Sequence, residues 1–231
     1  TVLWQSTRFE RYQHYLEILL DRGLAYACEC SRRILRQQGV ANGPLGQIYP
    51  GNCRDKHLSI AGHSIRLNTA NAGNIAFDDL VYGHFAMELA HEVGDFVLQR
   101  ADSIYAYHLA VVVDDAEQGI TEVVRGADLL ENTCLHLFLQ RQLGFSSPGY
   151  LHFPLVNNAA GDKLSKQTGA AAVKPLQAAQ QLVDALAHLG QQPDPALADA
   201  SVTEILQWAV THWNPLCIPA HQATRADNFS D

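Results

Sequence analysis

The sequence predicts a mixed α/β fold that is followed by an all-helical tail. Two patterns predict it: apolar residues recur at helical spacing in some segments and alternate with polar residues in others. With 231 residues, 47% of them hydrophobic and 17% charged, the chain has the composition of a soluble globular protein and can bury a sizeable core. No apolar run approaches the roughly 20 residues of a membrane-spanning helix, so we expect no membrane association.

The sequence up to residue 69 predicts one helix, two strands and an insertion. The helix is expected after Ser6, a capping residue type, and it should end at Gly23. Residues 24–28 (LAYAC) predict a short strand, and residues 63–69 (HSIRLNT) alternate as a strand does. Residues 39–63 are rich in Gly, Pro and Asn without periodicity, which predicts an irregular insertion. The apolar positions of the helix follow helical spacing: Phe9, Tyr12, Leu16, Leu19 and Leu20.

Residues 107–119 (YHLAVVVDDAEQG) admit two interpretations. The valine run favours a buried strand, but several apolar residues share one face of a helix that Gly119 would end, and we favour the helix. Residues 120–126 (ITEVVRG) predict a short strand, and residues 128–143 predict a helix that ends at Gly144. The residues of the shared face are Leu109, Val112, Val113 and Ala116.

Two further helices are expected after the loop at residues 161–169. The second opens with Ser201 and Glu204, which match a capping box, and it should run to about Trp213. No segment repeats internally.

The charge balance limits the possible partners. Sixteen Lys and Arg against 24 Asp and Glu give a net charge of −8, which argues against nonspecific coating of nucleic acid. Between Glu29 and Asp55, however, the chain has no acidic residue. This stretch is either a solvated face or a local basic patch. Its basic residues include Arg32, Arg33, Arg36 and Arg54.

Three of the five cysteines gather at Cys28, Cys30 and Cys53, which does not resemble a disulfide framework and fits a reducing, cytoplasmic setting. Three soft ligands next to an irregular loop suit zinc, although three buried thiols are the simpler alternative. The spacing of Cys53 and His57 favours histidine as the fourth ligand, since Tyr49 would be an uncommon one. The other two cysteines, Cys134 and Cys217, are expected in the core.

The loop GDKLSKQTG, residues 161–169, places Lys163 and Lys166 three positions apart. Lysine is a compact charge with three donors, so two lysines on one loop could hold a triphosphate and stabilise departing pyrophosphate. The pattern alone is more typical of a solvated turn.

Longer stretches give the loop a context. KLSKQ resembles the KMSKS loop of class I aminoacyl-tRNA synthetases, and residues 107–133 and 150–166 resemble the glutamyl-tRNA synthetase group in both spacing and order. The motifs CEC and YPGNC resemble the zinc-bearing acceptor-stem insertion of that group. There the ligands are Cys, Cys, Tyr and Cys. The resemblance therefore implies a site of Cys28, Cys30, Tyr49 and Cys53, with His57 as the fallback.

The resemblance also implies a fold and site residues. The fold would be an α/β, Rossmann-like class I catalytic domain that lacks its first half and carries a zinc-bearing insertion and a C-terminal helical stem. Tyr107 and Arg125 match the tyrosine and the arginine that bind glutamate in the family. The guanidinium of Arg125 could hold a glutamate carboxylate through two parallel hydrogen bonds. Lys166 matches an ATP-binding lysine, with Lys163 in support. The implied segments are 1–27 (end of the first Rossmann half), 28–100 (insertion), 101–170 (second Rossmann half) and 171–231 (stem).

The tail ILQWAVTHWNPLCIPAHQA resembles truncated paralogues within the group. These activate glutamate with ATP, with Mg²⁺ expected beside the nucleotide, and transfer it to the queuosine base of tRNA(Asp). The resemblance implies that activity for this protein. We expect the protein to be a monomer. Two alternatives stay open: a truncated glutamyl-tRNA synthetase that charges the tRNA 3′ end, and a noncatalytic zinc-dependent RNA-binding paralogue.

The sequence also departs from the family. It contains no H-x-G-H segment, begins at Thr1, and has Met87 as its only methionine. We therefore expect that the chain starts downstream of the segment that holds much of ATP and glutamate, and that alone it forms the adenylate poorly. Normal pyrophosphate exchange by this chain would contradict that expectation. At three positions other residues replace family ones: Leu135 and His136 stand for an Arg-Gln pair, and Ser103 stands for a glycine.

Overall fold

The structure is a computed structural model that describes residues 2–157, 163–165, 172–220 and 223–225. The chain divides into two compact units, each built from separate segments. Unit 1 comprises Thr1–Phe77, His84–Val123 and Glu131–Gly149, and unit 2 comprises Asp78–Gly83, Val124–Leu130 and Tyr150–Asp231. None of the helices in the described ranges combines the length and apolar character needed to cross a membrane.

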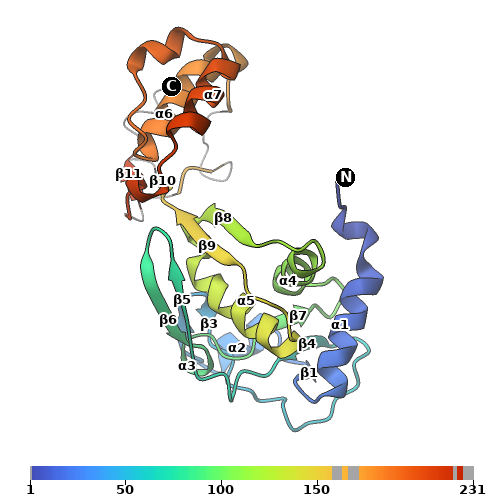
Figure 1. Cartoon of the computed structure of the whole chain (residues 1–231). Helices are drawn as coiled ribbons and strands as arrows, with labels where there is room; N and C mark the ends of the chain where they lie inside the picture. The colour runs from blue at the N-terminus through green and yellow to red at the C-terminus, as the bar shows by residue number, and fades with distance from the viewer. Residues whose placement is uncertain (1, 158–162, 166–171, 221–222, 226–231) are drawn as a thin grey trace. The chain divides into compact units, whose positions relative to one another are not determined.

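Unit 1 is built around an antiparallel sheet in the order β1-β4-β7, formed by Ala25–Cys28, Ser64–Leu67 and Val97–Gln99. Helix α1 (Phe9–Asp21) packs against β1 and against α4 (Tyr107–Glu117) (Figure 1). Helix α5 (Leu130–Leu143) supplies further apolar side chains to the same core. The fully buried residues of this core include Leu16, Leu19, Ile65, Leu67, Leu98, Leu109 and Leu139.

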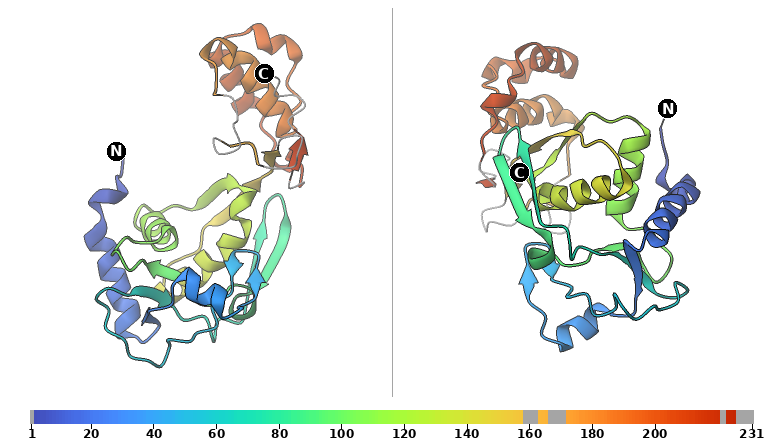
Figure 2. Two further views of the ribbon diagram at one scale, coloured as in Figure 1. Left: turned by 180° about the vertical axis from the view of Figure 1, so that it is seen from behind. Right: turned by 60° about the horizontal axis from the view of Figure 1, so that its bottom comes forward.

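The insertion between β1 and β4 contains more order than its composition predicts. After the helix α2 (Arg32–Gln37), the strands β2 (Asn42–Gly43) and β3 (Gly46–Gln47) form a short antiparallel hairpin. The helix and the hairpin lie next to each other (Figure 2). The rest of the insertion is irregular, as predicted, and the short helix α3 (Leu89–Glu92) follows later in the chain.

A second sheet has the order β6-β5-β9-β8, formed by Gly83–Glu88, Asn74–Asp79, Gly149–Phe153 and Glu122–Gly126. The division between the units passes through several of these strands. Within unit 2, Asp79 of β5 pairs in parallel with Tyr150 of β9. This pairing brings together residues 71 positions apart, which no local pattern predicts.

Unit 2 continues into helices. Strand β10 (Leu155–Asn157) pairs in parallel with β11 (Ala223–Arg225), and α6 (Ala178–His188) packs against α7 (Val202–His212). Short 3₁₀ turns, η4 (Pro175–Gln177), η5 (Pro195–Asp199) and η6 (Pro215–Cys217), connect and follow these helices. The predicted capping box is confirmed, because Ser201 and Glu204 cap each other's backbone N–H groups. The core of this part is Val183, Leu186 and Ile205.

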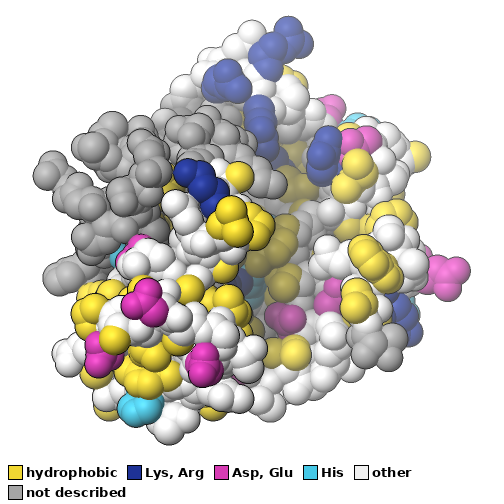
Figure 3. Space-filling view, turned by 90° about the horizontal axis from the view of Figure 1, so that it is seen from above, with side chains coloured by type: hydrophobic (Ala, Val, Ile, Leu, Met, Phe, Trp, Pro, Cys, Tyr) yellow, Lys and Arg dark blue, Asp and Glu magenta, His cyan; other side chains and the backbone are white. Residues whose placement is uncertain are grey.

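A second face of α7 carries exposed apolar side chains. Val202, Leu206 and Val210 recur every fourth residue and are all exposed, Val210 by 83%. Figure 3, which views the molecule from above, shows hydrophobic side chains gathered on part of the surface with acidic groups between them.

Most of the predicted elements are confirmed, including α1, β1, β4, the helical interpretation of residues 107–119, β8 and α5. The prediction for Ser6 is wrong: it lies in the 3₁₀ turn η1 (Gln5–Thr7), and the N-cap residue of α1 is Arg8. Arg8 instead forms ion pairs with Asp114 and Glu117 of α4. Gly23, with φ of 67°, ends α1 as predicted.

Ser103 provides a test of backbone strain. Its φ of 63° lies in the left-handed region, where a side chain costs roughly 1–2 kcal/mol relative to glycine. Ser103→Gly is therefore expected to fold at least as stably as the parent, since relief of strain offsets glycine's extra chain entropy. Ser103→Val is expected to lose about 1–2 kcal/mol, because β-branched residues avoid this region. Urea unfolding of the three proteins checks this, and equal loss in both variants would contradict it.

Candidate functional site

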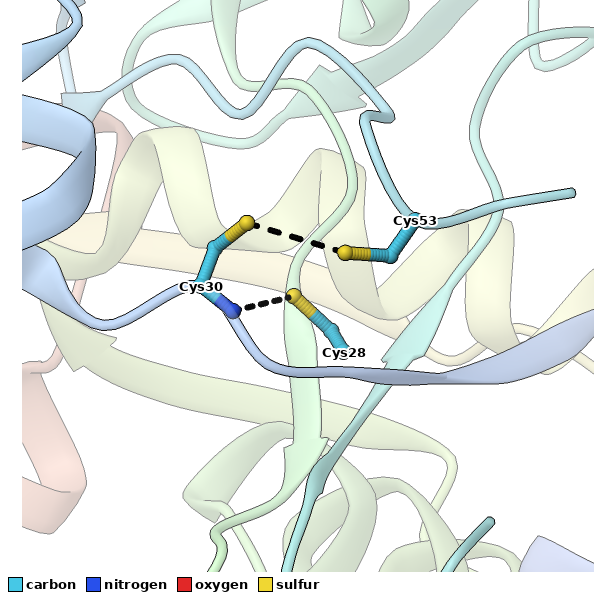
Figure 4. Close-up of side chains that lie close together, drawn as sticks. All are labelled: Cys28, Cys30 and Cys53. Atoms are coloured by element: carbon cyan, nitrogen blue, oxygen red, sulfur yellow. Dashed lines mark hydrogen bonds between the residues drawn. The ribbon is translucent and has the colours of Figure 1, made fainter. Parts of the chain in front are cut away.

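Three cysteine thiols form a compact cluster in unit 1. Cys28 ends β1, Cys30 follows it, and Cys53 comes from the insertion; all three are buried, and their sulfur atoms lie within 4.8 Å of one another. Figure 4 shows the sulfur atoms of Cys30 and Cys53 facing each other at 3.6 Å, while the backbone N–H of Cys30 donates to the sulfur of Cys28. Free buried thiols at such spacing form a soft donor set of the kind that binds zinc.

The structure distinguishes the two candidates for a fourth ligand. The hydroxyl oxygen of Tyr49 lies 3.3 Å from the sulfur of Cys28 and 3.7 Å from that of Cys30, and this side chain is buried. His57 is exposed and does not belong to the cluster. Burial raises the pKa of the Tyr49 phenol, and it raises the pKa of the Cys30 thiol to about 11. A bound cation would lower the pKa values of both groups again, because it favours the deprotonated ligands.

The surrounding residues hold Tyr49 and Cys28 in place. Arg66 of β4 is buried, donates from Nε to the sulfur of Cys28 at 3.2 Å, and lies over the Tyr49 ring at 4.0 Å from its centroid. The backbone of Gly94 touches that of Tyr49, since an added Cβ would lie 2.1 Å from the Tyr49 carbonyl oxygen. Asp95 accepts two hydrogen bonds of 2.7 Å from Arg54, and these bonds attach the insertion to the sheet.

A pocket of about 1280 Å³ lies beside this cluster within unit 1. Residues of α2, the β2–β3 hairpin and the start of α4 line it, with Cys30 and Tyr107 among them. Among the described residues that line it, Asp95 is the one acidic residue, so the pocket suits an anionic occupant. Its basic lining residues are Arg32, Arg36, Arg66 and Arg100.

Tyr107 occupies the first turn of α4, where 47% of its surface is exposed. Its ring lies 5.6 Å from that of His136, and His136 in turn contacts His108 through a 3.1 Å hydrogen bond. The far end of α4 is attached to α1: Arg8 contacts Asp114 at 2.6 Å, and Glu117 pairs with two arginines. These contacts fix the helix that carries Tyr107.

The pairing of Glu117 predicts a pH effect on stability. Hydrogen bonds from Arg11 and Arg8 lower the pKa of Glu117 from 4.5 to about 2, against a smaller opposing effect of burial. The stabilisation is therefore complete above pH 4.5 and is lost as the pH falls towards 2. Glu117→Gln should remove roughly 1–2 kcal/mol at pH 7, after allowance for solvent screening, and should flatten the acid limb of the stability curve. Urea unfolding from pH 7 to pH 2 measures this. The exposed control Glu10→Gln should leave the curve unchanged, and an unaltered curve in Glu117→Gln would contradict the prediction.

Arg125, the other predicted glutamate-binding residue, lies on β8 in unit 2. Its Nε donates to Nε2 of His152 at 3.1 Å, and its Nη2 donates to the carbonyl oxygen of Leu129 at 3.2 Å. Nδ1 of His152 lies 2.7 Å from the Asp79 carboxylate, and both side chains are fully buried. Asp79 and His152 are not among the site residues that the sequence predicts. The polar His152 within the otherwise apolar stretch of the strand GYLHF was the available signal.

The predicted phosphate-binding lysines are described only in part. Lys163 pairs with Asp128 at 2.5 Å and lines a second pocket, of about 520 Å³, within unit 2. Leu155 and His188 also line this pocket. Lys166 lies outside the described residues.

Comparison with known proteins places this arrangement in a family. Residues 1–190 match the family described as tRNA synthetases class I (E and Q), catalytic domain. The chain therefore belongs to the class I tRNA synthetases of the glutamate and glutamine group. The crystal structure of a glutamate tRNA ligase from Elizabethkingia meningosepticum, in complex with its amino acid, matches with a TM-score of 0.68 at 22% identity. This likeness, which shows the fold alone, covers 96% of this chain and 51% of that one, so this chain spans about half of that protein's length.

The curated relatives are more specific. A Glutamyl-Q tRNA(Asp) synthetase from Aromatoleum aromaticum is 45% identical over 230 residues, which are 99% of this chain and 72% of the relative. A Glutamyl-Q tRNA(Asp) synthetase from Pseudomonas aeruginosa is 48% identical over 215 residues, 93% of this chain and 71% of the relative. The resemblance seen in the sequence is confirmed, as is the mixed α/β class I catalytic fold. The zinc-bearing insertion, the helical stem, the four segment boundaries and the roles of the site residues stay predictions.

Proposed function

We propose that the protein, as the whole product of its gene, activates glutamate with ATP and transfers the glutamyl group to the queuosine base of tRNA(Asp). The observation that carries this proposal is the 45–48% identity, over 93–99% of the chain, to relatives named for that activity. The alternative of a truncated glutamyl-tRNA synthetase has weaker support, because the structural relative with that name is 22% identical.

The reaction needs positioned charges rather than a protein nucleophile. A glutamate carboxylate oxygen attacks the α-phosphorus of ATP, the bond to the β-phosphate breaks, and pyrophosphate leaves. A hydroxyl of the modified base then attacks the glutamyl carbonyl, and AMP leaves. Tyr107 and Arg125 would bind glutamate, while Lys163 and Lys166 would hold the phosphates together with Mg²⁺. Most of the catalysis would then come from orientation and charge stabilisation.

The cysteine cluster would hold a structural zinc ion. Cys28, Cys30 and Cys53 with Tyr49 supply four converging donors, which fit tetrahedral coordination. When bound, zinc would supply folding energy to an insertion that has little apolar content.

The basic side chains of the pocket would contact the RNA. Arg32 and Arg36 are exposed and form no ion pair within the described part of the chain, so they can approach phosphates. Because the net charge is −8, such binding would rest on local contacts and weaken with added salt. We propose that the protein acts as a cytoplasmic monomer.

The experiment uses the whole product of the gene with labelled glutamate, ATP and queuosine-containing tRNA(Asp), followed by nuclease digestion. Label in the anticodon fragment is the expected result. Label at the tRNA 3′ end would show an ordinary glutamyl-tRNA synthetase instead. RNA binding without any label would support a noncatalytic RNA-binding protein and overturn the proposal.

A further inference from the structure

We propose that His152 and Asp79 are positioning residues that orient the Arg125 guanidinium for a substrate carboxylate without neutralising its charge. This inference rests on the proposed function, in which Arg125 binds glutamate. It concerns three residues of unit 2 that come from three different segments of the chain.

The hydrogen bonds select one protonation state of His152. The Arg125 guanidinium can only donate, so Nε2 of His152, which receives the Nε–H of Arg125 at 3.1 Å, must be the acceptor. The single ring proton then lies on Nδ1, where it is donated to the Asp79 carboxylate at 2.7 Å. A doubly protonated imidazole would point an N–H at the Nε–H of Arg125. The geometry therefore favours a neutral His152 with its proton on Nδ1.

Asp79 is itself held in place. One carboxylate oxygen accepts the backbone N–H groups of Val81 and Tyr82 at 3.0 and 2.9 Å, and the other accepts the backbone N–H of His152 at 3.1 Å. Both Asp79 and His152 are fully buried, so water does not compete for these bonds. The carboxylate therefore fixes the ring of His152 from two directions, through its backbone and its side chain.

The imidazole separates Asp79 from Arg125, and this separation has a chemical consequence. A direct Asp–Arg pair would orient the guanidinium but would also compete with a substrate carboxylate for its charge. A neutral imidazole transmits the orientation and carries no charge of its own. A second bond, from Nη2 to the carbonyl oxygen of Leu129, fixes the guanidinium plane from the other side. The arrangement thus preorganises a positively charged carboxylate site.

Three variants test this inference on the whole gene product. His152→Leu removes the acceptor, and Asp79→Asn turns an amide N–H towards Nδ1, which forces the opposite tautomer. Both should weaken glutamate binding about tenfold or more, as expected for loss of a hydrogen bond to a charged group. His152→Gln keeps a donor for Asp79 and an acceptor for Arg125, so it should stay within about threefold of the parent. The control Leu151→Ala, a buried neighbour on β9, should lower the melting temperature but leave the glutamate Kd unchanged.

Nuclear magnetic resonance of the same proteins measures the tautomer of His152 and its hydrogen bond to Arg125 without any substrate. The ¹⁵N shifts of His152 should show the Nδ1–H tautomer, and the Nε–H of Arg125 should exchange slowly in the parent and in His152→Gln but rapidly in His152→Leu. An Nε2–H or doubly protonated His152, or full glutamate affinity in His152→Leu, would overturn the inference. If the parent shows the expected resonances yet binds no glutamate, the positioning holds and the proposed substrate fails.

Discussion

Replacing Arg125 with methionine is expected to weaken glutamate binding by about 100-fold or more. Loss of one partner from a desolvated, hydrogen-bonded charge pair costs roughly 2–5 kcal/mol, and the substrate carboxylate would lose its cationic partner. Arg125→Lys should recover little of the affinity. A lysine ammonium is a point charge that cannot reproduce the planar geometry by which Arg125 contacts both His152 and the Leu129 carbonyl.

Isothermal titration calorimetry of the whole gene product with glutamate measures this effect directly. Arg141→Met is a matched control, since it removes the same charge from an exposed position on α5 and should leave the Kd unchanged. Affinity for glutamate in Arg125→Met within a few-fold of the parent would show that the carboxylate binds elsewhere.

Substitution of Cys53 by serine is expected to abolish zinc binding and to lower the melting temperature by about 10 °C or more. Structural zinc sites contribute several kcal/mol or more to folding, and each kcal/mol shifts the melting temperature by about 2–4 °C for a chain of this length. The effect should be large because Cys53 lies in an insertion whose packing depends on a few buried residues: Cys28, Cys30, Leu35, Tyr49 and Cys53.

Metal content by mass spectrometry and calorimetric melting with and without a chelator measure the effect. Cys217→Ser is the control: we expected Cys217 in the core, but it is exposed, so its loss should change neither quantity. The same assay separates the fourth-ligand candidates, since Tyr49→Phe should weaken zinc binding and His57→Ala should not. The prediction would be contradicted if the untreated parent contained no metal and melted at the same temperature as Cys53→Ser.

The sequence predicted the local parts of this site well because they depend on short spacings. Cys28 and Cys30 are two positions apart, and the soft-ligand chemistry alone indicated that Cys53 joins them. The spacing of Cys53 and His57 favours His57 as the fourth ligand, because spacing does not report burial. The left-handed backbone of His57 (φ 47°) and its exposed side chain are tertiary features.

The partners of Arg125 could not be predicted from the sequence. His152 lies 27 positions after it, and Asp79 lies 73 positions before His152. Only the pairing of β5 with β9 brings Asp79 and His152 together, and neither strand carries a local signal for that pairing. The Ser6 prediction failed for a similar reason: ion pairs between Arg8 and residues of α4, about 106 positions away, accompany the start of α1.

The discontinuous build of unit 2 has a consequence for how the protein folds. Its three segments contribute Asp79, Arg125 and His152 in turn, so the arginine cannot be oriented until the last segment has left the ribosome. Closing such long loops is entropically costly before the contacts form, which makes this region a late event on the folding pathway. Pulse-labelled hydrogen exchange during refolding should therefore protect the amides of β1 and β4 before those of β9. A nascent chain that ends before Tyr150 would present a formed cysteine cluster and no oriented arginine.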